Sequence, residues 1–281
     1  AQPPEQLLQL AGWRAPGMPL NRGGSLREPA VNQPWSVGDV CPRFPIPSQP
    51  PPFLRLFAAS LTLLLSLTVH QPSRAAEPIV LAGPAMGTTY RVTLAAPLKT
   101  LSRGEVHREL EVVLARIDAA ASTWRADSSV SRFNAGPADE WIPVADDLAA
   151  IVEIAQSVHE QTEGRFDITV SPLIELWSQA HAAGREPSSA AVAAAMADVG
   201  MQHLTLRRAA DGSGKLRKAR PGLTLNLGGI GPGYAVDCLG ARLERLGSAG
   251  HLVVLGGEAR AWGTQADGSP WEVQLPHSSR T

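Results

Sequence analysis

Four glycines crowd into the six residues from 228 to 233, and this stretch is the best candidate in the chain for ligand chemistry. Residues 223–227, directly before it, alternate apolar and polar side chains as a half-buried strand does. Pro232 suits the first turn of a helix, where its missing N–H costs nothing. A strand, a glycine turn and a helix N-terminus together offer free N–H groups and a positive dipole end. The arrangement favours binding of an anion, usually a phosphate.

Two familiar nucleotide-binding patterns can be tested on this stretch, and both fail. The dinucleotide fingerprint G-x-G-x-x-G would start at Gly229 and Gly231, but its last glycine falls on Tyr234. The P-loop pattern requires Lys and then Ser or Thr after Gly233, where the chain has Tyr234 and Ala235. A tight turn that binds no ligand therefore stays open as the alternative.

The elements that must position this turn follow from hydrophobic periodicity. A strand is predicted from Thr88 to Leu94, and an amphipathic helix from Arg103 to Ala121. Trp124 comes just after that helix, where it either packs on the core or stacks on a planar ligand. A β-branched strand is predicted over residues 165–171. Two further strands joined by a second glycine turn are predicted over residues 251–263.

Composition excludes one class of partner. The chain has 281 residues, a formal net charge of −1 and a hydrophobic fraction of 44%, which is typical of a folded domain. Since there is no basic excess, nothing indicates a nucleic-acid partner.

The first part of the chain is predicted to lie outside the folded domain. Residues 1–55 are rich in proline without sustained periodicity, which predicts a disordered leader or an over-extended gene start. Residues 56–75 contain a short apolar run and end in small residues at Ala75, as a secretory signal peptide does. The run is too short for a comfortable membrane span, which needs about 20 residues. We therefore expect export, with cleavage near Ala75, of a domain covering residues 76–281.

Several motifs, each weak alone, occur in an order that resembles the flavin transferase family known as ApbE-like proteins, from about Pro84 to Trp271. They are Ala85-Met86-Gly87-Thr88, Ser122-x-Trp124, Ser128-x-x-Ser131-Arg132-Phe133-Asn134, Gly164-x-Phe166-Asp167-x-Thr169-Val170, Leu225-x-Leu227-Gly228-Gly229-Ile230-x-x-Gly233-Tyr234-Ala235-x-Asp237 and Gly256-Gly257-Glu258.

The resemblance implies a fold of the α+β class, with an antiparallel-rich sheet packed with helices. It also implies an exported, periplasmic enzyme that binds FAD and Mg²⁺ and moves FMN onto a Thr or Ser of an acceptor protein. The acceptor is left open as soluble or membrane-associated. No general base is visible, so catalytic residues are left unassigned.

Site residues carry over from the same resemblance. Met86 and Trp124 look like contacts to the flavin nucleotide. Arg165, Phe166 and Asp167 look like the segment that holds FAD.

The glycine turn then looks like the pyrophosphate and metal site. The Gly229 carbonyl stands in the place of a metal ligand, and Asn226 and Pro232 stand at nucleotide-binding positions. The family commonly has Asp where this chain has Asn226, and Lys where it has Pro232. A negative and a positive charge are therefore absent.

One further departure concerns the end of the chain. The family's later Asp-Ala-x-x-Thr segment, with its metal ligands, has no counterpart before Thr281, so we expect a C-terminally incomplete domain. The form of the second glycine turn and the missing Lys resemble the accessory branch tied to nitrous oxide respiration.

Three hypotheses follow: an FMN transferase, a catalytically degenerate protein that binds or delivers flavin, or a fragment that binds nothing. The printed chain is expected to bind FAD and to transfer FMN poorly.

Overall fold

The computed structural model describes residues 78–210 and 213–273, all within one compact unit of the chain. The predicted leader at residues 1–55 and the predicted signal peptide at 56–75 lie outside the described residues. Both ends of the predicted domain, 76–281, lie outside them too. Among the helices that are described, none is long and apolar enough to span a lipid bilayer.

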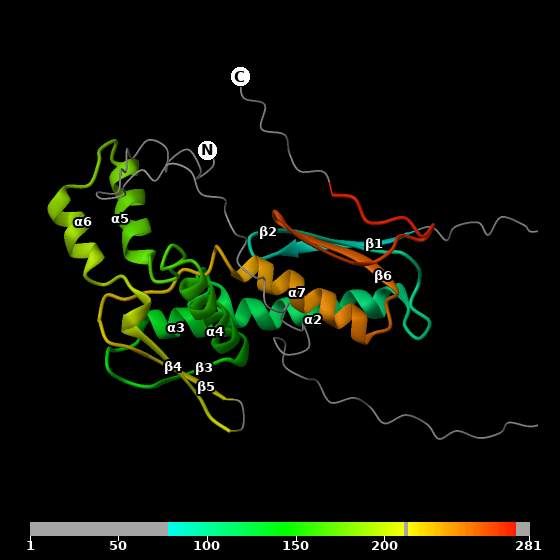
Figure 1. Cartoon of the computed structure of the whole chain (residues 1–281), viewed down its shortest axis with the longest axis horizontal. Helices are drawn as coiled ribbons and strands as arrows, with labels where there is room; N and C mark the ends of the chain where they lie inside the picture. Colours follow the sequence, from blue (N-terminus) through cyan, green and yellow to red (C-terminus); the bar gives the residue numbers. More distant parts are fainter. Residues whose placement is uncertain (1–77, 211–212, 274–281) are drawn as a thin grey trace, which may run out of the picture. The chain divides into compact units, whose positions relative to one another are not determined.

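The larger sheet has four antiparallel strands (Figure 1). Their spatial order is β1 (Ile79–Ala85), β2 (Thr88–Leu94), β6 (Gly250–Leu255) and β7 (Glu258–Gly263). Met86-Gly87 joins the first pair and Gly256-Gly257 joins the last pair. Because Tyr90 of β2 lies opposite Leu255 of β6, both of these tight turns lie at the same end of the sheet.

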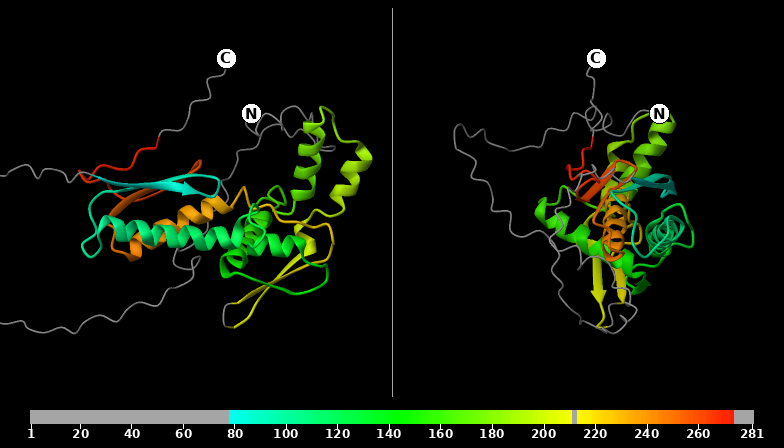
Figure 2. Two further views of the ribbon diagram at one scale, coloured as in Figure 1. Left: turned by 180° about the vertical axis from the view of Figure 1, so that it is seen from behind. Right: turned by 90° about the vertical axis from the view of Figure 1, so that its right-hand side faces the viewer.

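Helices α2 (Arg103–Ala121) and α7 (Gly231–Arg245) lie side by side against this sheet (Figures 1 and 2). The start of α2 is fixed by a capping box: the Ser102 hydroxyl accepts from the Glu105 N–H, and the Glu105 carboxylate accepts from the Ser102 N–H. Its apolar stripe is buried at Val106, Leu110, Val113, Leu114 and Ile117. The helix predicted from periodicity is confirmed at both ends.

A smaller sheet and the remaining helices complete the described part of the chain. Its strands, in spatial order, are β3 (Ile142–Val144), β5 (Gly214–Lys218) and β4 (Leu204–Arg208). The helices are α3 (Ser129–Ala135), α4 (Asp146–Gln161), α5 (Ser171–Ala182) and α6 (Ser189–Met196), with a short 3₁₀ turn at Met201–His203. Every strand pair in both sheets is antiparallel. The predicted α+β class with an antiparallel-rich sheet is confirmed.

The strand predicted over residues 165–171 is wrong. Residues 165–170 form turns and irregular backbone, and α5 already begins at Ser171. The reason is the Asp167 side chain, whose Oδ1 accepts from both the N–H and the hydroxyl of Thr169, at 2.7 and 2.6 Å. An aspartate that hydrogen-bonds its own backbone in this way stabilises a turn instead of a strand.

The strand predicted over residues 223–227 keeps its burial pattern but pairs with none of the strands in the described part of the chain. Leu223, Leu225 and Leu227 are buried, and the residues between them are half-buried. The Asn134 amide takes the place of a neighbouring strand: its Oδ1 accepts from the Leu225 N–H at 2.8 Å, and its Nδ2 donates to the Leu225 carbonyl at 3.1 Å. The segment is therefore extended because side chains hold it.

Candidate functional site

A cavity of about 340 Å³ opens where three distant segments meet, and we call it the turn cavity. Its walls come from the β1–β2 turn, the residues around the end of α2, and the glycine turn that leads into α7. The lining residues are Met86, Gly87, Asp118, Ala121, Ser122, Thr123, Trp124, Arg125, Leu227, Gly228, Gly231 and Pro232. The structure therefore brings together Met86, Trp124 and Pro232, three of the predicted site residues.

Trp124 is exposed over 92% of its surface, which decides between its two open interpretations. It does not pack in the core. An exposed indole on a cavity wall offers a flat apolar face to a ring that stacks on it. Its position follows from the end of α2 at Ala121: Ser122 is extended, and Thr123 and Trp124 then form a turn.

Met86 adopts an unusual backbone conformation. Its φ is +50° and that of Gly87 is +75°, so both central residues of this two-residue hairpin turn are left-handed, as a type I′ turn requires. A left-handed Met costs free energy, and such strain gathers at functional sites. A Cβ built on Gly231 would lie 3.5 Å from the Met86 methyl. The hairpin turn is thus in reach of the glycine turn.

The backbone conformation of the turn does not by itself require glycine. None of Gly228, Gly229, Gly231 and Gly233 has a φ in the left-handed region. A Cβ on Gly233 would meet no described atom within 4 Å, and one on Gly229 would meet the Phe166 ring at an ordinary 3.5 Å. Since the fold alone does not require glycine at these two positions, the bare backbone fits a site that a ligand approaches closely.

Asn226 shapes the start of this turn. Its Oδ1 accepts from the Gly228 N–H at 2.9 Å, and its own N–H donates to the Ile168 carbonyl at 2.8 Å. Helix α7 then begins at Gly231 with no side-chain N-cap and no acidic residue in its first turn. The positive end of the helix dipole is therefore not offset by a carboxylate of its own first turn.

The other predicted FAD contacts are less central. Phe166 is half-buried and borders Gly229, as the built Cβ shows. Arg165 is exposed, with its guanidinium 3.2 Å from the Glu163 carboxylate. Asp167 is committed to Thr169 and to the Met201 N–H. Five predicted site residues do not line the turn cavity: Arg165, Phe166, Asp167, Asn226 and Gly229.

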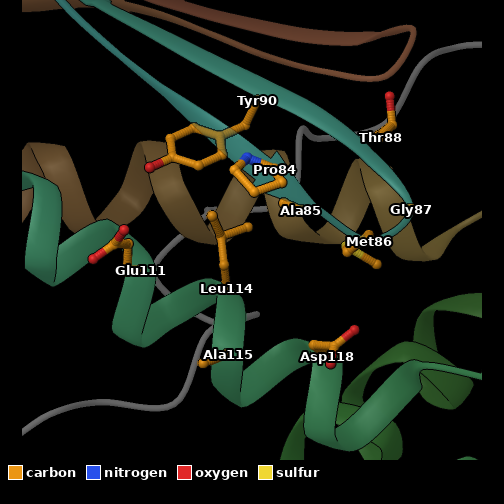
Figure 3. Close-up of a pocket in the computed structure, with 10 residues that line it drawn as sticks. All are labelled: Pro84, Ala85, Met86, Gly87, Thr88, Tyr90, Glu111, Leu114, Ala115 and Asp118. Carbon is orange, nitrogen blue, oxygen red and sulfur yellow. The ribbon is translucent and has the colours of Figure 1, made fainter. Parts of the chain in front are cut away.

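A second cavity, of about 620 Å³, adjoins the first between the β1–β2 hairpin and α2 (Figure 3). We call it the hairpin cavity; it shares Met86, Gly87 and Asp118 with the turn cavity. The Tyr90 hydroxyl is buried beside it and has no hydrogen-bond partner among the described residues. Burial and the nearby Glu111 carboxylate raise the pKa of Tyr90, so this phenol stays protonated.

Asp118 and Arg125 are site residues that sequence reasoning did not identify. Asp118 lines both cavities and Arg125 lines the turn cavity. The Arg125 Nη1 lies 3.2 Å from the Asp118 carboxylate. The run from Asp118 to Ser122 imitates the family's Asp-Ala-x-x-Thr segment, but it lies at the end of a helix where the family has no metal site. Arg125 follows Trp124 directly, and proximity in sequence does not say which way a side chain points.

The implied ligands can be tested against these walls. The chemical groups that line the turn cavity suit FAD, because an indole face can stack on a ring and bare glycine backbone can approach a phosphate. For Mg²⁺, the predicted ligand residue Gly229 is exposed and follows Gly228 of the cavity wall, but it lines neither cavity itself. Among residues 78–210 and 213–273, no group of three or more His, Cys, Asp or Glu side chains could hold a metal. Mg²⁺ commonly takes its remaining ligands from waters and substrate phosphates.

Known proteins resemble this chain over most of its length. The sequence model of the ApbE family matches residues 86–280. The chain is 30% identical over 231 residues to a FAD:protein FMN transferase of Haemophilus influenzae, covering 81% of this chain and 66% of the relative. It is 34% identical over 223 residues to the FAD:protein FMN transferase of Salmonella typhimurium, covering 77% and 63%. The chain thus spans just under two thirds of the length of these relatives.

Solved structures agree. The flavin transferase ApbE from Vibrio cholerae matches with a TM-score of 0.64 and 32% identity, covering 71% of this chain and 64% of that one. The apo form of the Pseudomonas stutzeri flavinyl transferase ApbE matches with a TM-score of 0.63 and 36% identity, covering 71% and 62%.

Proposed function

The chain belongs to the ApbE family, and on that premise we propose that it transfers FMN from FAD to a hydroxyl group of an acceptor protein. The observation that carries the proposal is the turn cavity, in which Met86, Trp124 and Pro232 line one space although they lie far apart in the sequence. The names of the relatives, FAD:protein FMN transferase, support the same reaction.

The reaction is a phosphoryl-type transfer. The oxygen of an acceptor Thr or Ser bonds to the phosphorus of the FMN half, the bond from that phosphorus to the bridging oxygen breaks, and AMP leaves. The hydroxyl proton is lost to solvent or to a base. Such reactions are accelerated mainly by positioning and by electrostatic stabilisation of developing charge.

The residues of the chain supply the positioning. Trp124 would stack on a ring of FAD. The bare glycine backbone and the N-terminus of α7 would hold the pyrophosphate, since both present N–H groups to an anion. The Gly229 carbonyl would be one ligand of Mg²⁺, which when bound would neutralise charge on the leaving phosphate.

We also propose that the protein is exported and acts on a periplasmic acceptor, soluble or membrane-associated. The support is the apolar run and the small residues at 56–75, which match a signal peptide. N-terminal sequencing of the exported protein should begin near Ala76. Recovery of only the uncut chain from the cytoplasm would contradict this proposal.

The test of transfer uses the purified chain, FAD, Mg²⁺ and a flavin-acceptor domain, with flavin fluorescence of the acceptor read in a denaturing gel. An acceptor whose target Thr is changed to Val is the matched control, because it keeps the shape and loses the hydroxyl. The proposal expects labelling that needs the hydroxyl and decreases with a chelator.

A second candidate is a protein that binds flavin without transferring it. Asn226 and Pro232 favour it, because neither brings a charge to the phosphates or the metal. Tight FAD binding without any labelling of the acceptor, at any Mg²⁺ concentration, would select this candidate.

A further inference from the structure

We infer that Arg125 is the phosphate-binding cation of the turn cavity. The inference rests on the proposed function, because it takes FAD as the ligand. It goes further in naming the side chain that recognises the pyrophosphate, although the anion site predicted from the sequence lies in the glycine turn more than a hundred residues away.

The charges on the cavity walls point to this residue. Among the described residues that line the turn cavity, Arg125 is the one that carries a positive charge, and Asp118 is the one that carries a negative charge. The ligand brings a negative charge on each phosphate. Pro232, on the glycine-turn wall of the same cavity, has neither a cation nor an N–H to donate. Arg125 is therefore the side chain with which the cavity can offset the charge of the pyrophosphate.

Arg125 is also held in place before any ligand binds. Its Nε and Nη2 donate to the two carboxylate oxygens of Asp127, at 3.1 and 2.9 Å. Its Nη1 donates to Asp118 at 3.2 Å. These hydrogen bonds raise the pKa of Arg125, those to Asp127 most strongly. A guanidinium has more N–H donors than these three bonds use, so donors remain for a phosphate.

Asp118 has the opposite effect on the ligand. It lines both cavities, and Figure 3 shows it on α2 across from Met86 of the hairpin turn. Its carboxylate competes with the phosphate for Arg125 and repels the phosphate charge directly. The pair therefore gives predictions of opposite sign: loss of Arg125 weakens FAD binding, and loss of the Asp118 charge strengthens it.

The experiment compares FAD with riboflavin, which has no phosphate. Both are titrated into the purified full chain and its variants, by flavin fluorescence or calorimetry. Arg125→Ala should weaken FAD affinity roughly tenfold or more, the scale of a lost hydrogen bond to a charged group, and leave riboflavin affinity unchanged. The FAD affinity of Arg125→Lys should lie between those of the unmodified chain and Arg125→Ala, since Lys keeps the charge but lacks the two-pronged donor geometry of the guanidinium. The matched control is Arg108→Ala, an exposed arginine of α2 that lines neither cavity.

Asp118→Asn is the variant that separates ligand recognition from structure. The asparagine still accepts a hydrogen bond from Arg125 but has no charge, so FAD affinity should rise severalfold and riboflavin affinity should stay the same. If the Asp118–Arg125 pair only stabilised the loop, both substitutions would weaken FAD and riboflavin alike.

Three results would overturn the inference alone. Equal losses of FAD and riboflavin affinity in Arg125→Ala would assign a structural role to Arg125. Weaker FAD binding in Asp118→Asn would contradict the competition between carboxylate and phosphate. FAD affinity unchanged in Arg125→Ala would refute the inference while leaving the proposed function intact. Failure of the unmodified chain to bind any flavin would instead overturn the proposed function, and this inference with it.

Discussion

At the scale of single residues, the candidate site contains two residues with unusual features, one in its exposure and one in its backbone conformation. Trp124 is almost fully exposed, and Met86 has a left-handed backbone that costs free energy. Neither feature stabilises the protein by itself. Both features are consistent with the proposed function, in which a flat ligand binds between the hairpin turn and the end of α2.

Trp124→Ala should weaken FAD binding by about 1–2 kcal/mol, the scale of an aromatic pair. Because the side chain is exposed, the melting temperature of the ligand-free protein should not change. Trp124→Tyr should retain most of the affinity. The measurements are a flavin titration and a thermal melt, and a lower melting temperature with unchanged FAD affinity would contradict a stacking role.

Asn226→Asp should make FAD binding more dependent on metal. The carboxylate can keep the hydrogen bond from the Gly228 N–H, but it adds a negative charge close to the predicted phosphate and metal site. We expect weaker FAD binding than in the unmodified chain when a chelator is present, and stronger binding when Mg²⁺ is present. Affinity that changes in the same direction under both conditions would contradict this arrangement.

At the scale of elements, the glycine turn is held from behind by side chains. Asn134 of α3 hydrogen-bonds both backbone groups of Leu225. Lys218 of β5 is fully buried, and its Nζ donates to the Asn134 carbonyl at 2.7 Å and to the Leu223 carbonyl at 3.1 Å. Burial lowers the pKa of Lys218. These two residues link the smaller sheet and α3 to the segment that carries the turn.

Asn134→Ala should destabilise the protein by about 2 kcal/mol or more, because it removes two hydrogen bonds and leaves the Leu225 backbone groups without partners. It should also weaken FAD binding, since residues 223–227 aim the turn. Urea unfolding and a flavin titration measure the two effects. The matched control is Ser131→Ala on the same helix, where the hydroxyl makes only a long 3.4 Å bond to the Ser122 carbonyl; an equal loss in both variants would argue against a specific role of Asn134.

At the scale of the whole described unit, the site lies where the larger sheet, the end of α2 and the start of α7 converge. The sheet places the hairpin turn, and α2 and α7 pack side by side against it. The stability of that sheet therefore bears on the site. Among the described residues, His251 on β6 is the one fully buried histidine. Because its protonation depends on pH, it makes the stability of this sheet testable by changing the pH.

Stability should fall as the pH falls below about 6.5. Burial, and secondly Arg260, lower the pKa of His251 to about 4, whereas an unfolded chain has a histidine pKa of about 6.5. Between these values the unfolded chain binds the proton more strongly, so protonation favours unfolding. The expected loss between pH 7 and pH 5 is about 2 kcal/mol from this residue. Urea unfolding at both pH values measures it, and a His251→Gln variant that loses just as much would assign the effect to other groups.

The sequence by itself determined the elements whose signal is local. The strand Thr88–Leu94 and the helix Arg103–Ala121 were predicted with the bounds that the structure has. The strand carries its own two-residue alternation, and the helix carries its own apolar stripe, which begins just after the capping box of Ser102 and Glu105. The motif order also identified the family. The strand predicted over residues 165–171 was wrong because the Asp167 side chain hydrogen-bonds Thr169 and stabilises a turn, against the β-propensity of the neighbouring residues.

Only the tertiary structure decided which residues share the cavity. Periodicity could not tell whether Trp124 packs in the core or faces a ligand, because the exposure of a side chain after a helix depends on which distant segments pack around it. Asp118 and Arg125 were missed for the same reason: which wall a charged side chain lines depends on how α2, the hairpin and the glycine turn meet. Alternation correctly predicted the burial of residues 223–227, yet their hydrogen-bond partner is the side chain of Asn134. A pattern along the chain determines which face is buried, and long-range packing determines what lies against it.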